Sequence, residues 1–227
     1  TKMPYRKRKR GKYEKKGKVI IRKNNGLTIC KVPSVCPDIM QVELTYNRTS
    51  GYNASAPVVQ VFRGNSIFDP DFTGVGSQPM GHDQWATLYR RYRVIGSKIT
   101  VRTNSLDGTD ASGLVITPLN TSGIVSDPEM YIQGAYAAQG YNATTGDNSP
   151  QIVSNYITTS KMRGMPKDAF MYEDDLGAAV GSNPLKTWYW HVCWYNSSAV
   201  VNSINGTATV KIVYYVQFYD RETLSTS

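Results

Sequence analysis

Histidine and cysteine, on which many catalytic and metal sites depend, are scarce in this sequence. Its 227 residues include only two histidines and three cysteines. His82 and His191 fall in different predicted elements, and Cys30, Cys36 and Cys193 show no zinc-binding spacing. The odd, scattered cysteines argue against a disulfide scaffold, so we interpret them as free thiols of an intracellular protein. We therefore predict no enzyme activity, no cofactor and no metal site.

Other catalytic and membrane signals are missing as well. The sequence has no G-x-S-x-G nucleophile motif, and the glycines of residues 74–81 are not followed by a phosphate-binding GK[ST]. The acidic run Glu173-Asp174-Asp175 could hold a divalent cation, although a solvated loop is the favoured interpretation. No apolar run approaches the roughly 18 residues of a membrane span, so we predict no membrane insertion. The N-terminus has no apolar leader segment, and we expect further residues upstream of Thr1.

The positive charge is concentrated at the N-terminus. Residues 1–23 contain 12 lysines and arginines against one glutamate, a net charge of +11, whereas the other residues hold 14 basic and 16 acidic side chains, a net charge of −2. Such asymmetry is typical of proteins with a polyanionic partner. We predict a basic arm over residues 1–36, partly disordered, a body over 37–222 and a short tail over 223–227.

The arm favours nucleic acid as its partner, because clustered cations release the counterions of phosphates and tyrosines can stack on bases. Three further cations, on the non-core side of predicted strands, are expected to join it, with ordinary surface or subunit contacts as the open alternative. The cluster Arg6, Lys7, Arg8, Lys9 and Arg10 also has the composition of a nuclear localisation signal. The candidate nucleic-acid-binding residues are Tyr5, Arg6, Lys7, Arg8, Lys9, Arg10, Lys12, Tyr13, Lys15, Lys16, Lys18, Arg22, Lys23, Lys98, Arg102 and Lys211.

The body alternates strand-like runs with loops rich in glycine, asparagine, serine and threonine. Period-two alternation predicts strands at 38–46, 93–103, 187–195 and 207–220, and short apolar or β-rich runs predict strands at 57–62, 113–119 and 151–160, with a weaker one near 167–172. There is no regular alternation of strands and helices, so a parallel sheet is disfavoured. We predict an all-β fold, a single eight-stranded antiparallel jelly roll of two sheets with long loops and one or two short helices.

The stretch "PMGHDQWATLYRRYRVI" at 79–95 predicts a loop, a short helix and a strand. Asp83 is expected to cap a helix over 83–92, with Trp85, Leu88, Tyr89 and Tyr92 on one face. A second short helix is expected near 126–136. We interpret His82 as a loop histidine rather than a catalytic one. The residues predicted to form the core or a subunit interface are Trp85, Tyr89, Arg90, Arg91 and Tyr92.

Two blocks of the sequence resemble capsid proteins of circo-like viruses with circular single-stranded DNA genomes. Residues 65–101 are similar to a family pattern with a "D-x-x-G-x-G-x-Q-P-x-G-x-D-Q" loop, an aromatic helix and an "R-Y-x-V-x-G-S-K-I" strand. The block at 181–194, "GSNPLKTWYWHVCW", resembles a second part of the family pattern. The matching residues of the first block are Asp71, Gly74, Gly76, Gln78, Pro79, Gly81, Asp83, Gln84, Arg91, Tyr92, Val94, Gly96, Ser97, Lys98 and Ile99.

The resemblance implies a jelly-roll coat protein that assembles into an icosahedral shell, T=1 with about 60 copies. The arm would face inward, package the single-stranded DNA and direct the protein to the host nucleus through the import machinery; the protein would be found in the virion and the host nucleus. A host-cell attachment factor is expected but not identified. The alternatives are a nuclear nucleic-acid-binding or histone-chaperone β-sandwich protein and a secreted lectin-like jelly roll.

Overall fold

The computed structural model describes residues 22–24, 27–29, 36–105, 112–141, 150–196 and 204–223. The chain divides into two compact units, residues 1–37 and residues 38–227. In the first unit, β1 (Arg22–Asn24) and β2 (Leu27–Ile29) form an antiparallel pair. All other elements belong to the second unit, which carries the candidate site.

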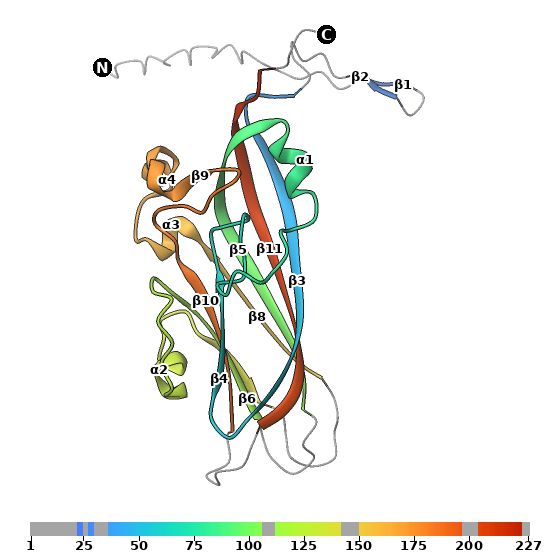
Figure 1. Ribbon diagram of the computed structural model, residues 1–227. Coiled ribbons are helices and arrows are strands. Elements are labelled where there is room, and N and C mark those ends of the chain that lie inside the picture. The colour runs from blue at the N-terminus through green and yellow to red at the C-terminus, as the bar shows by residue number, and fades with distance from the viewer. Residues whose placement is uncertain are drawn as a thin grey trace, which may run out of the picture. The chain divides into compact units, whose positions relative to one another are not determined.

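The second unit consists of two antiparallel sheets (Figure 1). The first sheet has the order β3 (Met40–Ala54), β11 (Ile204–Arg221), β5 (Tyr89–Ser105) and β8 (Gln151–Thr158), with β9 (Gly177–Ala179) paired to β5. The second sheet has the order β4 (Val58–Arg63), β10 (Tyr189–Asn196), β6 (Ser112–Leu119) and β7 (Ala138–Tyr141). From β3 to β6 each successive strand crosses to the other sheet. This topology is a jelly roll, which confirms the predicted fold class.

The core lies between the two sheets, where alternate residues of each strand meet. In β11, Val210, Ile212 and Tyr214 are buried, whereas the side chain of Lys211 is exposed, as the period-two pattern predicts. Polar contacts also join the sheets: the Nε1 of Trp190 donates to the Oγ of Ser97 at 2.9 Å. Burial of these large side chains supplies the main stabilisation of the sandwich.

Strands β6 and β10 of the second sheet are buried on both faces, and residues of the segment 120–137 cover their outer side. This segment contains α2 (Pro128–Ile132), whose first turn is capped by Asp127, which accepts from the backbone N–H of Glu129 at 2.9 Å. Tyr131 of α2 packs with Val115 of β6 and with Cys193 and Tyr195 of β10. The helix expected near 126–136 therefore exists, but it is only five residues long.

The helix predicted over 83–92 is largely wrong. Helix α1 spans only His82–Ala86, and β5 begins at Tyr89, so Tyr89 and Tyr92 are strand residues. The N-cap is Gly81, with φ of 90°, and the exposed carboxylate of Asp83 bonds the ring of His82 instead of capping the helix. Pairing of this segment with β11 and β9 overrides the helical spacing of its aromatic residues.

The weak strand predicted near 167–172 is also wrong, because this segment forms α4 (Lys167–Tyr172). It follows α3 (Thr159–Met162) and precedes the 3-10 turn η1 (Asp174–Leu176). Buried Arg93 of β5 donates to the carbonyls of Met171 and Glu173 and lies over the ring of Phe170. A cation at the C-terminal end of α4 complements the partial negative charge of the last carbonyls. Among the helices of the described ranges, none has the length and apolarity needed to cross a bilayer.

Candidate nucleic-acid interface

The predicted nucleic-acid-binding residues separate into two groups in the structure. Tyr5 to Lys18 of the arm lie outside the described residues, and of Arg22 and Lys23 only the backbone of β1 is described. Lys98 and Arg102 of β5 and Lys211 of β11 lie in the body, and all three side chains are exposed. These three form the basic part of the surface that we call the cationic face, the outer side of the sheet β3-β11-β5-β8.

The strand register brings the three cations of the cationic face close together. Lys211 is directly opposite Thr100, Lys98 is opposite Val213, and Arg102 is opposite Thr209. Lys211 is therefore the diagonal neighbour of both Lys98 and Arg102. Diagonal neighbours on adjacent antiparallel strands have backbones roughly 7–8 Å apart. Long basic side chains at this separation can contact successive phosphates of one strand.

No acidic side chain neutralises these cations. Within the described ranges, none of the three has a carboxylate oxygen within ion-pair distance, unlike five other arginines of the body. The only acidic residue of β3 on this face is Glu43, which pairs in register with Tyr215 rather than with a cation. The remaining neighbours are small and polar: the hydroxyls of Thr100 and Ser154 are hydrogen bonded at 2.9 Å. The face therefore presents uncompensated positive charge to solvent.

Two aromatic side chains on the cationic face were missed by the sequence analysis. Tyr156 of β8 is 52% exposed and lies opposite Lys98 in the strand register. Its ring meets the edge of Tyr215 at a centroid distance of 5.8 Å, and Gly96 of β5, which has no side chain, is the register partner of Tyr215. In the predicted strand 151–160, Tyr156 shares a face with Ser154, opposite the apolar Val153 and Ile157, and this spacing is the signal that could have identified it.

This arrangement has the two chemical elements of single-strand binding. Cations that contact phosphates supply affinity without sequence preference, and an exposed aromatic ring offers a surface on which a base can stack. The arm residues predicted to bind nucleic acid would add to the same electrostatic attraction.

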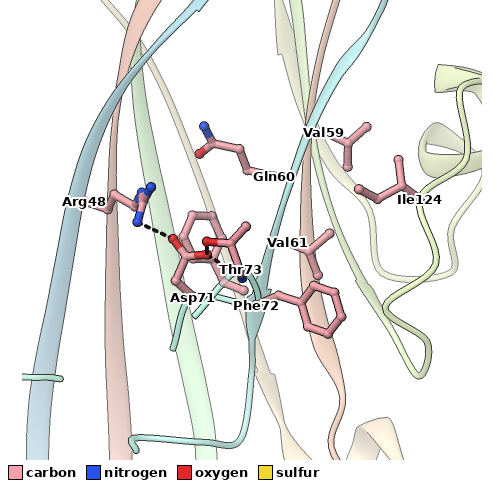
Figure 2. A pocket seen from close by; sticks show the side chains of 9 residues that line it. Arg48, Val59, Gln60, Val61, Asp71, Phe72, Thr73 and Ile124 are labelled. Atoms are coloured by element: carbon pink, nitrogen blue, oxygen red, sulfur yellow. Dashed lines mark hydrogen bonds and ion pairs between the residues drawn. The ribbon is translucent and has the colours of Figure 1, made fainter. Parts of the chain in front are cut away.

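The glycine-rich loop of the first resemblance block has a structural role. Figure 2 shows Asp71 between Arg48 and Thr73: its buried carboxylate pairs with Arg48 at 2.5 Å and accepts from the N–H and hydroxyl of Thr73. Gly76 packs so closely that an added Cβ would lie 2.7 Å from the hydroxyl of Tyr46. Gly74 adopts a positive φ of 72°. The aspartate and the glycines of this loop are thus explained by its close packing against β3.

The residues predicted to form the core or an interface also separate. Tyr89 and Tyr92 are fully buried core residues, and Trp85 is half-buried against Phe218, with ring centroids 5.7 Å apart. Arg90 forms an ion pair with Glu222 at 2.9 Å, and Arg91 lies over the ring of Tyr219. The two arginines are therefore engaged within the unit.

Neither histidine belongs to a catalytic arrangement in the described part of the chain. His82 is the first residue of α1 rather than a residue of the loop before it, and its buried ring bonds both Asp83 and the carbonyl of Val180. His191 is buried beneath α2, its ring stacked on Tyr131 at 5.5 Å. Both side chains fasten segments of the fold to each other.

The acidic run 173–175 is held by basic side chains. Lys186 contacts Glu173 at 2.7 Å and Asp175 at 2.9 Å, and Asp174 lies 4.0 Å from Arg91. Among the residues described, no group of three or more histidine, cysteine, aspartate or glutamate side chains could hold a metal ion. The geometry therefore assigns these carboxylates to ion pairs of the segment that leads into β10.

Comparisons with known proteins find likeness in structure only. No family model matches the chain, and no curated protein matches its sequence. A structure of cocksfoot mottle virus is 13% identical and has a TM-score of 0.48, covering 82% of this chain and 97% of its own. A turnip yellow mosaic virus structure is 11% identical, with a TM-score of 0.45 and coverages of 84% and 99%. A decameric BFDV capsid protein is 14% identical, with a TM-score of 0.40 and coverages of 79% and 97%. Likenesses at these identities and scores do not establish a family or an activity.

Proposed function

We propose that this chain is the coat protein of a virus with a circular single-stranded DNA genome. Copies of it assemble into an icosahedral shell, T=1 with about 60 subunits, and package the DNA. The arm and the cationic face bind the phosphates, and residues 6–10 serve as the nuclear localisation signal. The observation that carries the proposal is the group of three uncompensated cations on one exposed sheet face of a jelly roll that follows an arm of net charge +11.

The proposal that the chain is a viral coat protein is supported by the resemblance of residues 65–101 and 181–194 to circo-like capsid proteins. Within the described residues, the body has no acidic tract that would hold a basic client, apart from the run 173–175, which is engaged by Lys186 and Arg91. This observation disfavours the histone-chaperone alternative. A carbohydrate-binding jelly roll would have no use for the charge of the arm.

Negative-stain electron microscopy of the purified chain tests the assembly. We expect uniform closed shells, because a coat forms only when many copies of the chain associate. A chain that remains monomeric across salt and pH conditions would refute the coat-protein proposal.

Titration of a single-stranded DNA oligonucleotide against salt tests the cationic face. Each phosphate contact contributes about 0.7 to the slope of log K against log salt for single strands. The variant K98A/R102A/K211A should therefore lower that slope by about 2. Removal of residues 1–18 should lower it further and should prevent packaging, while the body still folds.

Lys167→Ala is the matched control for the cationic face. Lys167 is an exposed lysine on α4, with no ion-pair partner among the described residues, and it is not a residue of the sheet. The control removes one positive charge and should leave the slope unchanged. An equal effect of Lys98→Ala and Lys167→Ala would show that only net charge matters and would remove the face from the proposal.

A further inference from the structure

A hollow of about 200 Å³ lies where β3, β11 and β5 run side by side in the first sheet. It coincides with a bulge: Gly96 is the register partner of Tyr215, and Val94 is that of Val216. Ile95, between the two, therefore has no partner on β11. An unpaired residue of this kind bends its strand and disrupts the ladder locally. The lining residues are Gln41, Val42, Glu43, Ile95, Tyr215 and Val216.

The hollow opens on the cationic face. On β11 the buried Tyr214 is followed by Tyr215, which therefore points to the outer side of the sheet. Glu43 is the register partner of Tyr215 and is exposed on the same side. Tyr215 is also the diagonal neighbour of Lys98 across β11 and β5, at a backbone separation of roughly 7–8 Å. A nucleotide whose phosphate contacts Lys98 can therefore reach the hollow with its base.

Glu43 places a negative charge on a surface that is otherwise basic. Its carboxylate has no lysine or arginine within ion-pair distance in the part of the chain that the structure describes. Its register partner is Tyr215, and its diagonal neighbours on β11 are Val213 and Gln217, none of which is a cation. An unpaired carboxylate at this position repels the phosphates that the three cations attract. A contact between this carboxylate and a base would offset that repulsion and account for its position.

The size and the walls of the hollow suit a single planar base. Pockets for drug-sized ligands have volumes of about 300–1,000 Å³, and this hollow is smaller. The ring of Tyr215 forms one wall, on which a base can stack, and Ile95 adds apolar surface. The polar groups are the carboxylate of Glu43 and the amide of Gln41, both on exposed side chains of β3. The hollow therefore combines a stacking surface with groups that can read the edge of a base.

The carboxylate distinguishes the four bases by the edge that each base uses in pairing. An ionised carboxylate only accepts hydrogen bonds. Guanine offers it two adjacent donors, N1–H and the 2-amino group. Adenine and cytosine each offer one amino group next to an acceptor nitrogen, and thymine offers one N–H between two carbonyls. These edges are free in a single strand, where a base can be splayed out and read.

We propose that this hollow binds a guanine base of the single strand, with the carboxylate of Glu43 accepting from N1–H and from the 2-amino group. The amide of Gln41 donates to O6 of the guanine, and the ring of Tyr215 stacks on the base. The inference rests on the proposed function, because it names the base that the cationic face selects within the DNA that it binds. The three cations attract any sequence, so the hollow adds a preference that they do not supply.

Fluorescence anisotropy with labelled oligonucleotides tests this preference on the unassembled full chain, isolated by size-exclusion chromatography. The probes are a short oligothymidylate and the same strand with one central guanine, hypoxanthine, adenine or cytosine. We expect the guanine strand to bind about 5- to 20-fold more tightly than oligothymidylate, the low end for a bidentate pair because the hollow is open to solvent. Hypoxanthine, which keeps N1–H but lacks the 2-amino group, should give an intermediate affinity. The charge of the arm acts equally on all these strands, so it cancels in their ratio.

Glu43→Gln tests the carboxylate, and its two expected effects have opposite signs. The guanine preference should be lost, because an amide presents a single acceptor oxygen beside a donor. Oligothymidylate should bind at least as tightly as it binds the original chain, because a negative charge leaves the face. A misfolded variant would lose both, and Glu43→Asp should keep part of the preference. Glu129→Gln is the matched control: it makes the same change at an exposed position of α2, outside the sheet, and should keep the preference in full.

The inference is overturned if the original chain binds every strand equally, or if Glu43→Gln keeps the guanine preference, which would assign it to stacking alone. Free deoxyguanosine monophosphate that competes as well as the guanine strand would overturn the assignment to a base within a strand. The variant K98A/R102A/K211A should weaken the binding of all strands alike and leave their ratio unchanged. Equal binding of the strands with an intact salt slope would thus remove the hollow and leave the proposed function, whereas the absence of any binding would remove both.

Discussion

Lowering the pH from about 7.5 to about 5.5 is expected to destabilise the body through His191. Its ring is fully buried between β10 and α2, where Nε2 lies 2.8 Å from the carbonyl of Thr121. Nδ1 is buried and has no hydrogen-bond partner in the described structure. Burial lowers the pKa of His191 below its ordinary value, and the bond to Thr121 offsets only part of that effect. The native state therefore holds this ring in the neutral form.

The side chains around the ring of His191 do not offset the cost of protonating it. Tyr189, Cys193 and Tyr195 of β10, Tyr131 of α2 and Arg63 of β4, the register partner of Tyr189, are titratable or charged side chains on this side of the sheet. None of them is an acid at neutral pH, and burial raises the pKa of the Cys193 thiol to about 12. A protonated His191 would place a charge and a second donor, on Nδ1, where no acceptor is described.

The sign and size of the effect follow from proton linkage. The unfolded chain binds a proton near pH 6.5, whereas the folded chain binds it only at lower pH, so stability is lost as the pH falls below about 6.5. The loss is at most about 1.4 kcal/mol per pH unit for one proton. Between pH 7.5 and 5.5 it amounts to about 1.4 kcal/mol if the folded ring stays neutral throughout.

Urea unfolding followed by tryptophan fluorescence, repeated at several pH values, measures this loss. His191→Gln keeps a donor for the carbonyl of Thr121 but cannot titrate, so its stability should change less over the same range. His82 remains in both chains, which cancels its contribution in the comparison. The reasoning is refuted if the two chains show the same pH dependence, or if the original chain is more stable at the lower pH.

Two substitutions test the packing around the first resemblance block. Trp85→Ala removes a half-buried ring that stacks on Phe218, so urea unfolding should show a loss of roughly 2 kcal/mol, below the about 3–5 kcal/mol of a fully buried aromatic side chain; a loss under about 0.5 kcal/mol would mean that the ring contributes no packing energy. Gly76→Ala places a Cβ 2.7 Å from the hydroxyl of Tyr46 and 2.8 Å from the Cβ of Asp71, and it should cost roughly 1–3 kcal/mol. Gly181→Ala, whose Cβ would meet nothing within 4 Å, is its control, and equal stabilities of the two variants would contradict the close approach.

The strands were predictable wherever one face of a strand is buried and the other is solvated. The run at 207–220 alternates without interruption, and β11 (Ile204–Arg221) covers it in full. The short strands β7 (Ala138–Tyr141) and β9 (Gly177–Ala179) were not predicted, because their residues have no strand pattern of their own. They are strands only because they pair with β6 and β5, and such pairing is a property of the tertiary structure.

The candidate site was predictable in part for the same reason. Lys98, Arg102 and Lys211 were identified because each interrupts an apolar alternation, and the antiparallel register then makes Lys211 the diagonal neighbour of the other two. The contact between Tyr156 and Tyr215 could not be predicted, since the two residues lie on strands that are distant in sequence.

The contrast between β10 and β11 explains why only one sheet offers a broad polar face. In β11 the residues opposite the core are Lys211, Val213 and Tyr215, which solvent reaches. In β10 the corresponding residues, His191 and Cys193, are as buried as the core side, because the segment 120–137 covers them. A strand whose two faces are both apolar therefore marks a covered sheet, and one whose outer residues are polar marks an open sheet. By this criterion the open sheet is the one available to a polyanion.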